Sequence, residues 1–435
     1  MSRHLLLTAW AFAPARTSGV YRAIGLANAF SDAGWRVTVL TAPEKVFSDE
    51  GAVDTSLNAT VADGIVVRRV PFLSSVYSTD ISTWTRGQAR QPELWAWWHG
   101  RRFPEHGFGD WRRALSRAAF DVHRHTPVDL TLGTAGPSVD FIPGWELKRR
   151  TGVPSIMDYR DAWTFDTFTG LPNPRASRRA ERWEPRLMAS SDQIWFVNDP
   201  IREWHARKYP QYASRMRTVA NGFDETGDVS LGVPFVDRDE SGLTFGYIGT
   251  INTGRFPAEP LLSGWIRARE QSPLLRRSRV VLRGHLGRTG VASEELAAFL
   301  RRAAREDMVF EGPVARADVS SVYRDFDALV LALPSGPGIT SGKVFEYAAT
   351  GLPIVSIHDP SSAVAPFMAE SPAWVPTASL SPEDVAAAFI ETARLTGRQT
   401  AASRDEAIRW GAQWERGRQL SAGVRGATEL LEGRS

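Results

Sequence analysis

Two residues of opposite charge, Lys343 and Glu346, stand three positions apart in a segment typical of phosphate binding. The segment reads Pro334-Ser-Gly-Pro-Gly-Ile-Thr-Ser-Gly-Lys-Val-Phe-Glu-Tyr347. A predicted strand at 328–333 runs into this glycine-rich loop, and a short predicted helix follows. At the carboxyl end of a parallel strand, such a helix presents free backbone amides to an anion. Residues three apart share a helix face, so Lys343 could meet phosphate and Glu346 hydroxyls; a surface ion pair is the alternative.

A second candidate phosphate ligand is Arg255, which ends the segment Ile248-Gly-Thr-Ile-Asn-Thr-Gly-Arg255 after a predicted strand at 243–249. Glycines there let backbone amides approach an anion, and a guanidinium binds phosphate in bidentate fashion. The alternative is an ordinary turn with a surface arginine. The segment is neither a Gly-x-Gly-x-x-Gly fingerprint nor a Walker loop, so nicotinamide and ATP chemistry lose support.

Asp158 ends the predicted strand at 155–158, and two more charged residues, Arg160 and Asp161, follow it. In a parallel sheet they would face the ligand-binding edge, where they could orient an acceptor hydroxyl or its charged group. The alternative is an Arg–Asp pair that fixes the loop under Trp163.

Residues 74–118 combine tryptophans with arginines. The tryptophans are Trp84, Trp95, Trp97, Trp98 and Trp111, and the arginines are Arg86, Arg90, Arg101, Arg102, Arg112 and Arg113. Three interpretations stay open: an insertion that caps the first domain with its tryptophans packed inward, an acceptor-binding segment through Trp97 and Trp98, or a membrane contact.

The composition excludes several classes of protein. The chain has 435 residues, 43% of them apolar and 23% charged, which suits two globular domains. Without cysteine it has no disulfide framework, thiolate nucleophile or cysteine-ligated zinc. A net charge of +3 does not indicate a nucleic-acid-binding surface. The start at 1–15 is similar to a signal peptide, but we expect it to form a buried strand of a cytoplasmic protein.

The pattern of elements predicts an α/β fold with doubly wound parallel sheets. An apolar run at 4–11, a helical pattern at 21–33 ended by Gly34, and a β-rich stretch at 36–40 form a βαβ unit. Further strands are predicted at 65–68, 130–132, 155–158, 193–197, 217–220, 243–249, 279–283, 308–311, 328–333 and 353–357. The predicted parts are a first domain at 1–225, a linker at 226–240, a second domain at 241–400 and a final helix at 401–435 that packs back on the first domain.

These motifs together resemble family 4 glycosyltransferases. The strongest match is Ser-x-Lys-x-x-Glu-Tyr ahead of Gly351-Leu-Pro353. Asp158-Tyr-Arg-Asp-Ala-Trp163 resembles the Asp-x-Arg-Asp-Pro-Trp element of one subgroup. Other matching segments, in chain order, are 18–22 with 34–40, 219–224 and 310–314. The resemblance implies the GT-B fold, in which two Rossmann-like domains face each other across a cleft.

The resemblance also implies roles for single residues. Gly19 would bring its amide to the donor diphosphate, which Arg255 and Lys343 would neutralise, and Glu346 would hold the ribose hydroxyls. The remaining donor-site residues would be Val314, Gly338, Ile339, Thr340 and Ser341. Catalysis would rest on Arg255, Lys343 and Asp161, and the acceptor would meet Asp158, Arg160, Asp161, Trp97 and Trp98. Gly338 stands where the family usually has a first glutamate, and the usual histidine has no counterpart near 134–136.

The implied activity is transfer of a sugar from a nucleotide-diphosphate-sugar to a hydroxyl acceptor, with retention and without metal or another cofactor. The acceptor would be a small molecule, a glycan or a lipid-linked molecule, with peripheral membrane contact as an option. Two alternatives stay open: an epimerase of nucleotide-sugars with the same fold, and an inactive partner that binds nucleotide-sugar. The Asp-x-Asp pairs at 237/239 and 325/327 are poorly placed for a metal, because the first lies in the linker and the second precedes its strand.

Overall fold

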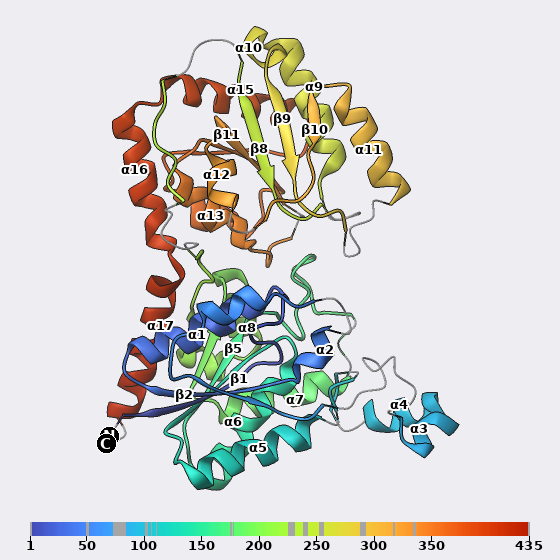
Figure 1. The fold of residues 1–435 in the computed structure, drawn as a ribbon, viewed down its shortest axis with the longest axis vertical. Helices are drawn as coiled ribbons and strands as arrows, with labels where there is room; N and C mark the ends of the chain where they lie inside the picture. The colour runs from blue at the N-terminus through green and yellow to red at the C-terminus, as the bar shows by residue number, and fades with distance from the viewer. Residues whose placement is uncertain are drawn as a thin grey trace. The chain divides into compact units, whose positions relative to one another are not determined.

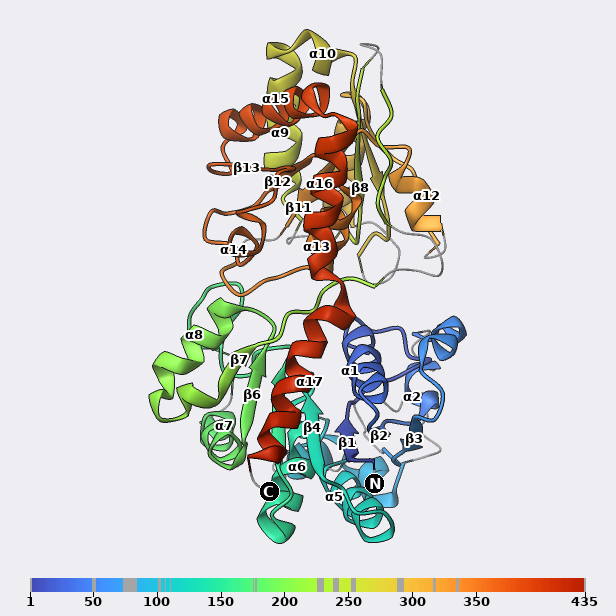
Figure 2. The ribbon, with the colours of Figure 1, turned by 90° about the vertical axis from the view of Figure 1, so that its left-hand side faces the viewer.

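The structure is a computed structural model of the chain. It describes residues 2–48, 52–72, 84–100, 103–105, 107–109, 111–174, 176, 178–224, 231–237, 242–251, 256–287, 293–315, 318–333 and 336–433. The chain forms two compact units, each built on its own sheet. Unit 1 comprises 1–166, 171–221 and 419–435, and unit 2 comprises 167–170 and 222–418. Figures 1 and 2 show the elements of both units.

Unit 1 contains a seven-stranded sheet in the order β3-β2-β1-β4-β5-β6-β7, with every pairing parallel. Its strands are β1 (His4–Thr8), β2 (Arg36–Thr41), β3 (Val66–Arg69), β4 (Leu130–Thr134), β5 (Ser155–Tyr159), β6 (Gln193–Phe196) and β7 (Met216–Thr218). The strand order reverses between β1 and β4, which is the point where doubly wound sheets bind ligands.

Helices connect these strands and cover both faces of the sheet. They are α1 (Val20–Asp32), α2 (Glu44–Ser48), α3 (Arg86–Arg90), α4 (Pro92–Gly100), α5 (Trp111–His125), α6 (Ile142–Thr151), α7 (Arg178–Ser190) and α8 (Asp199–Lys208). Among the described residues, 3₁₀ helices also occur: η1 (Thr55–Thr60), η3 (Ser138–Phe141) and η4 (Pro210–Arg215).

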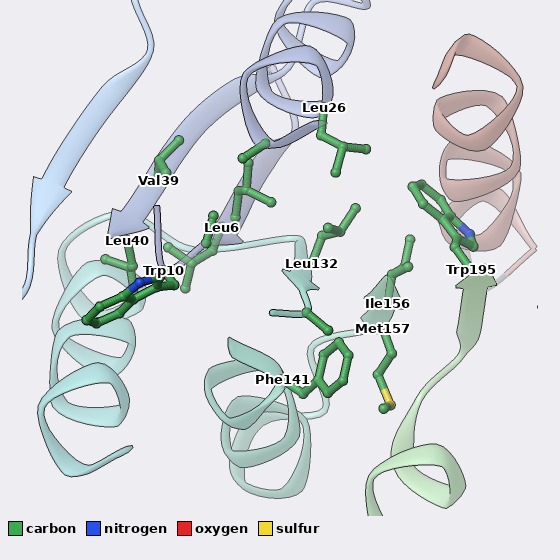
Figure 3. Packing of buried hydrophobic residues seen from close by; sticks show 14 of the residues in the cluster. Leu6, Trp10, Leu26, Val39, Leu40, Leu132, Phe141, Ile156, Met157 and Trp195 are labelled. Carbon is green, nitrogen blue, oxygen red and sulfur yellow. The ribbon is translucent and has the colours of Figure 1, made fainter. Parts of the chain in front are cut away.

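The core of unit 1 lies on both sides of the sheet. Ile156 and Met157 are neighbours on β5, and Figure 3 shows them pointing to opposite faces. Leu26 of α1 lies on one face and Phe141 on the other, and all four side chains are at most 5% exposed. Burial on two faces explains why central strands such as β1 read as continuous apolar runs in the sequence. The run near the N-terminus is the buried strand β1, as we predicted.

Unit 2 contains a six-stranded parallel sheet in the order β10-β9-β8-β11-β12-β13. Its strands are β8 (Thr244–Ile248), β9 (Arg279–Arg283), β10 (Met308–Phe310), β11 (Ala328–Ala332), β12 (Ile354–Ile357) and β13 (Trp374–Pro376). Its helices are α9 (Ala258–Gln271), α10 (Pro273–Arg276), α11 (Glu294–Ala304), α12 (Val319–Tyr323), α13 (Gly342–Thr350), α14 (Val364–Met368), α15 (Pro382–Arg398) and α16 (Ala401–Gly411).

The C-terminal segment continues through η6 (Ala412–Trp414) into α17 (Arg416–Glu432) and returns to unit 1 at Gln419. There Gln193 on β6 donates a hydrogen bond of 2.7 Å to the carbonyl of Gly426. A Cβ on Gly423 would lie 3.0 Å from the ring of Trp195, so glycine lets the helix approach this strand closely. Figure 2 shows α17 running along this sheet.

Two doubly wound parallel sheets with flanking helices confirm the predicted fold class. Strand β13 was missed by the sequence analysis because it is three residues long, lies at the sheet edge and ends in Pro376. Residues 231–237 are the described part of the predicted linker, and they belong to unit 2. Leu231 and Val233 are both 3% exposed, so the beginning of this part is buried. None of the described helices is long and apolar enough to cross a bilayer.

Candidate functional site

The N-terminus of α13 places Lys343 and Glu346 side by side at the carboxyl end of β11. Ser341 caps the helix by accepting a hydrogen bond of 3.3 Å from the amide of Lys343. Gly351, at φ +72°, ends the helix in the left-handed conformation that glycine favours. One turn in, the ammonium of Lys343 donates to Oε2 of Glu346 at 2.6 Å. Their side chains are 29% and 21% exposed, so a ligand can reach both.

Two buried tyrosines, Tyr323 and Tyr347, hold α13 in place through hydrogen bonds. The hydroxyl of Tyr323 donates to Oε2 of Glu346 at 3.2 Å. The hydroxyl of Tyr347 accepts from the amide of Ile248 at 2.8 Å and donates to its carbonyl at 3.2 Å, which ties α13 to the end of β8. Burial raises the pKa of both tyrosines well above the ordinary value, so both remain neutral donors.

Two of the backbone amides predicted to face the donor make contacts within the protein. The amide of Gly338 donates to the carbonyl of Thr167 at 3.0 Å, and the amide of Ile339 donates to Gly336 at 3.4 Å. Thr167 belongs to the short segment 167–170 that clusters with unit 2. A donor that used the Gly338 amide would therefore have to replace this carbonyl.

The loops after β8, β9 and β10 meet at the same edge of the unit 2 sheet. The amide of Gly284 donates to the carbonyl of Gly312 at 2.9 Å, two residues before Val314, which is half-buried. A Cβ on Gly284 would lie 1.8 Å from the carbonyl oxygen of Gly249, so only glycine fits there. Arg255, which the sequence analysis proposed as a phosphate ligand, lies outside the described residues.

At the carboxyl edge of the unit 1 sheet, Asp158 forms a buried ion pair with Arg22 of α1. Nη2 and Nε of Arg22 lie 2.5 and 2.7 Å from the two carboxylate oxygens, and Thr134 donates to Oδ2 at 2.7 Å. The two side chains of the pair are 1% and 0% exposed. Asp158 thus joins α1, β4 and β5, and its carboxylate is fully engaged inside the protein.

Arg160 and Asp161 lie directly beyond this ion pair and contact each other. A Cβ placed on Gly19 would lie 1.8 Å from Nη1 of Arg160, and one on Gly136 would lie 2.2 Å from Nη2. The guanidinium therefore fills the space over both glycines, where it is 16% exposed, whereas Asp161 is 64% exposed. The structure brings Gly19, Arg160 and Asp161 together at this edge.

Two carboxyl groups at the same edge, the buried Asp140 and the half-buried Glu105, were missed by the sequence analysis. Asp140 is 1% exposed and accepts from the amide of Trp10 at 2.7 Å, and Glu105 accepts from the amides at the start of η3 at 2.9 and 3.2 Å. Burial raises the pKa of both, and that of Asp140 well above its ordinary value. The signal available in sequence was weak, because lone acids in loops are usually solvated.

The tryptophans of residues 74–118 differ in exposure, and Trp84 and Trp95 are half-buried. Trp111 is 1% exposed and stands edge-on against Trp10 with ring centroids 4.9 Å apart. Trp97 and Trp98 on α4 are 55% and 57% exposed. Inward packing, one of the three interpretations left open for this segment, therefore describes Trp111 but not Trp97 and Trp98.

Comparison with known proteins identifies the fold. No protein-family model matches the sequence, and no curated protein matches it. Solved structures do match over the whole chain. A sucrose-phosphate synthase from Thermosynechococcus elongatus has a TM-score of 0.60 at 14% identity, with 100% of both chains covered. A glycosyltransferase from Rickettsia africae has a TM-score of 0.61 at 9% identity, with 99% of both chains covered.

A third similar structure is the UDP-GlcNAc 2-epimerase from Methanocaldococcus jannaschii. It has a TM-score of 0.52 at 9% identity, covering 99% of this chain and 100% of that one. At these identities the similarity shows the fold alone. The chain therefore has the two-domain, Rossmann-like GT-B fold, which glycosyltransferases and nucleotide-sugar epimerases share.

Proposed function

We propose that this protein is a glycosyltransferase that moves a sugar from a nucleotide-diphosphate-sugar to a hydroxyl acceptor. The observation that carries the proposal is the Lys343–Glu346 pair, which lies at the first turn of α13, after a glycine-rich loop and at the carboxyl end of β11. A cation and a carboxylate one turn apart match the phosphate and the ribose of such a donor.

In the proposed reaction, Lys343 stabilises the negative charge that grows on the departing nucleoside diphosphate, together with Arg255. Glu346 accepts hydrogen bonds from the ribose hydroxyls, and the loop of Gly338–Ser341 with Val314 completes the donor site. Lys343 and Arg255 would perform the electrostatic task that a divalent metal performs elsewhere, so we propose a reaction independent of metal and of other cofactors. Retention of anomeric configuration is part of the proposal, and it rests on the resemblance to family 4.

Unit 1 would bind the acceptor through Arg160 and Asp161, which stand beyond the buried Asp158 at the sheet edge. Asp161 is the more exposed of the two and is our candidate for orienting the hydroxyl that attacks. Trp97 and Trp98 offer apolar surface for an acceptor with a glycan or lipid part. A nucleotide-sugar epimerase is the second candidate, favoured by the structural similarity to UDP-GlcNAc 2-epimerase.

The test starts with binding. Isothermal titration of nucleoside diphosphates, with and without EDTA, should give the same affinity in both buffers. Glu346→Ala should weaken binding by about 1.5–3 kcal/mol, because a charged acceptor of ribose hydrogen bonds is lost. The matched control is Glu391→Ala, which removes an exposed ion pair of the same i,i+3 spacing with Arg394 on α15. Unchanged nucleotide affinity in folded Glu346→Ala would remove this residue from the site.

The reaction products then separate the candidates. Incubation of a nucleotide-sugar with an acceptor should release nucleoside diphosphate and form a glycoside, whose anomeric configuration NMR reads directly. Isomerised donor without acceptor would identify an epimerase instead. Binding without either product would identify an inactive nucleotide-sugar-binding protein.

A further inference from the structure

The chain after β5 continues into a hairpin at 164–173, which we call the strap. Two backbone hydrogen bonds hold its two sides together. The amide of Asp166 donates to the carbonyl of Leu171 at 2.9 Å, and the amide of Asn173 donates to the carbonyl of Thr164 at 2.8 Å. The strap therefore has a defined shape, with a short tip between its two paired sides.

The base of the strap is fixed in unit 1. Thr164 is 1% exposed, and its hydroxyl donates to Oε2 of the buried Glu184 and accepts from Nζ of Lys208 at 2.8 Å. Directly before it, the ring of Trp163 stacks on that of Phe103 with centroids 5.6 Å apart. Because these contacts hold the base in the core, movement of the strap is left to its tip.

The tip of the strap, Thr167–Gly170, clusters with unit 2, where it contacts the glycine-rich loop ahead of α13. The carbonyl of Thr167 accepts the hydrogen bond of 3.0 Å from the amide of Gly338. A Cβ on Gly336, which has φ +154°, would lie 2.7 Å from this same carbonyl oxygen. A loop without side chains at these positions is therefore what lets the backbone of the tip come so close.

An anionic ligand would compete for this amide with an advantage. The tip reads Thr-Phe-Thr-Gly and carries no charge, so the oxygen that it offers is a neutral carbonyl. A charged oxygen accepts a hydrogen bond roughly twice as strongly as a neutral one. An anion in this loop would also be attracted by the N-terminus of α13 and by Lys343 in its first turn. The contact of Thr167 with Gly338 is thus one that an anion can displace.

We propose that the tip of the strap is a built-in competitor of the nucleotide-sugar. The carbonyl of Thr167 occupies the amide of Gly338 in the free protein and leaves it when the donor binds. The strap thereby lowers the affinity for the donor and changes its own conformation when the donor loop is filled. The identity of the ligand rests on the proposed function, whereas the contact of the tip with the loop does not.

The first experiment lifts the tip off the loop with a single substitution, Gly170→Asn. Asparagine tolerates the left-handed conformation of Gly170, at φ +73°, but its Cβ would lie 2.8 Å from Cγ of Pro337. In titrations with UDP-glucose and GDP-mannose, the nucleotide-sugar that binds should bind about 3–10-fold more tightly, because no hydrogen bond has to be broken first. The matched control is Gly152→Asn, at φ +78° with nothing within 4 Å of its Cβ, which should leave the affinity unchanged.

A second variant removes the competing carbonyl itself. Replacing Thr167–Gly170 by Asn-Gly, a dipeptide that forms tight hairpin turns, keeps both hydrogen bonds of the strap and shortens its tip. We expect the same gain in donor affinity as in Gly170→Asn. Wild-type or weaker affinity in both variants, while binding still depends on Glu346, would overturn the role of the strap and keep the proposed function.

Limited proteolysis then follows the tip directly. Phe168 is 39% exposed, and chymotrypsin should cut after it more slowly while the tip is held on the loop. Without ligand, Gly170→Asn should be cut there several-fold faster than the wild type and Gly152→Asn, as measured by mass spectrometry of the fragments. Saturating nucleotide-sugar should speed the same cut in the wild type.

The outcomes separate the two proposals. Unchanged or slower cleavage after Phe168 on donor binding would overturn displacement of the tip, whatever the activity of the protein. If neither the wild type nor the two variants binds a nucleotide-sugar, the proposed function is wrong, and the role of the strap as a competitor is wrong with it.

Discussion

The carboxyl edges of the two sheets both carry a pair of opposite charges, but they bury these pairs to different degrees. In unit 1, Arg22 and Asp158 are 1% and 0% exposed, and the carboxylate also accepts from Thr134. In unit 2, Lys343 and Glu346 are 29% and 21% exposed and pair across one turn of a single helix. The first pair joins elements 136 residues apart, whereas the second joins neighbours.

This difference separates charges that hold the fold from charges that can serve a ligand. A buried pair cannot release its partner, because an unpaired charge in the interior is strongly unfavourable. A half-exposed pair on one helix contributes little to stability, so a ligand can displace one member at low cost. Within unit 1, Arg160 and Asp161 lie between these extremes, with a mostly buried cation and an exposed acid.

The largest expected effect comes from breaking the buried pair. Asp158→Ala should lower the free energy of unfolding by about 3–5 kcal/mol, because it leaves the guanidinium of Arg22 buried without its carboxylate. Chemical denaturation followed by circular dichroism measures this loss, and Glu391→Ala at an exposed pair should change stability by less than about 0.5 kcal/mol. A stable Asp158→Ala with a raised acceptor KM would instead place Asp158 in the acceptor site.

The partly exposed Lys343–Glu346 pair should behave in the opposite way: its loss should affect activity more than stability. If the protein has the proposed function, Lys343→Ala should depress kcat about 10²–10³-fold, because the proposed donor site loses the cation that would stabilise the leaving phosphate. Its melting temperature should stay near that of the wild type, since the lysine is only partly buried. Steady-state kinetics with Lys343→Arg, which keeps the charge but changes its shape, gives the control. A large loss of stability in Lys343→Ala would show that this pair, too, holds the fold.

A third test uses pH on another buried acid of unit 1, Glu184. Burial alone would raise its pKa, but His205, whose Nε2 lies 3.5 Å from Oε1, together with Lys208 and Thr164, holds it at about 2. A carboxyl group with a lowered pKa stabilises the fold above its unfolded value, and this contribution disappears as the pH falls toward 2. Between pH 5 and pH 2 the free energy of unfolding of the wild type should therefore fall by up to about 3 kcal/mol more than that of Glu184→Gln. Parallel pH profiles of unfolding free energy would contradict this.

The fold could be predicted from sequence patterns because its central strands are buried on both faces and its helices end at recognisable residues. The apolar run of β1 and the left-handed Gly34 after α1 are local signals, and the structure keeps both. The Lys343–Glu346 pair was also predictable, because residues three apart on a helix must lie on one face.

The unit 1 site was less predictable because its contacts join distant parts of the chain. Arg22 shares a helix face with Leu26 and Phe30, so an arginine among apolar positions could have signalled a buried partner. Nothing local identifies that partner as Asp158. The guanidinium of Arg160 over Gly19 depends on the same long-range packing, which periodicity does not contain.

The smallest expected effect on stability concerns the exposed tryptophans of α4. Trp97→Ala and Trp98→Ala should each change the free energy of unfolding by less than about 0.5 kcal/mol, because both side chains are more than half exposed. Trp111→Ala, at 1% exposure in the same segment, should cost about 3–5 kcal/mol. Within this one segment, the buried Trp111 would therefore stabilise the fold, whereas the exposed Trp97 and Trp98 are available to contact a ligand.

Functional assays of Trp97→Ala and Trp98→Ala then show whether these side chains contact the acceptor or a membrane. If α4 contacts the acceptor, Trp97→Ala and Trp98→Ala raise the acceptor KM several-fold and leave donor affinity unchanged. If it contacts a bilayer, the same variants lose sedimentation with anionic liposomes, because tryptophan beside arginines favours the membrane interface. Wild-type values in both assays would leave the exposed tryptophans without a part in acceptor or membrane binding, and Arg160 and Asp161 would then carry acceptor recognition in unit 1.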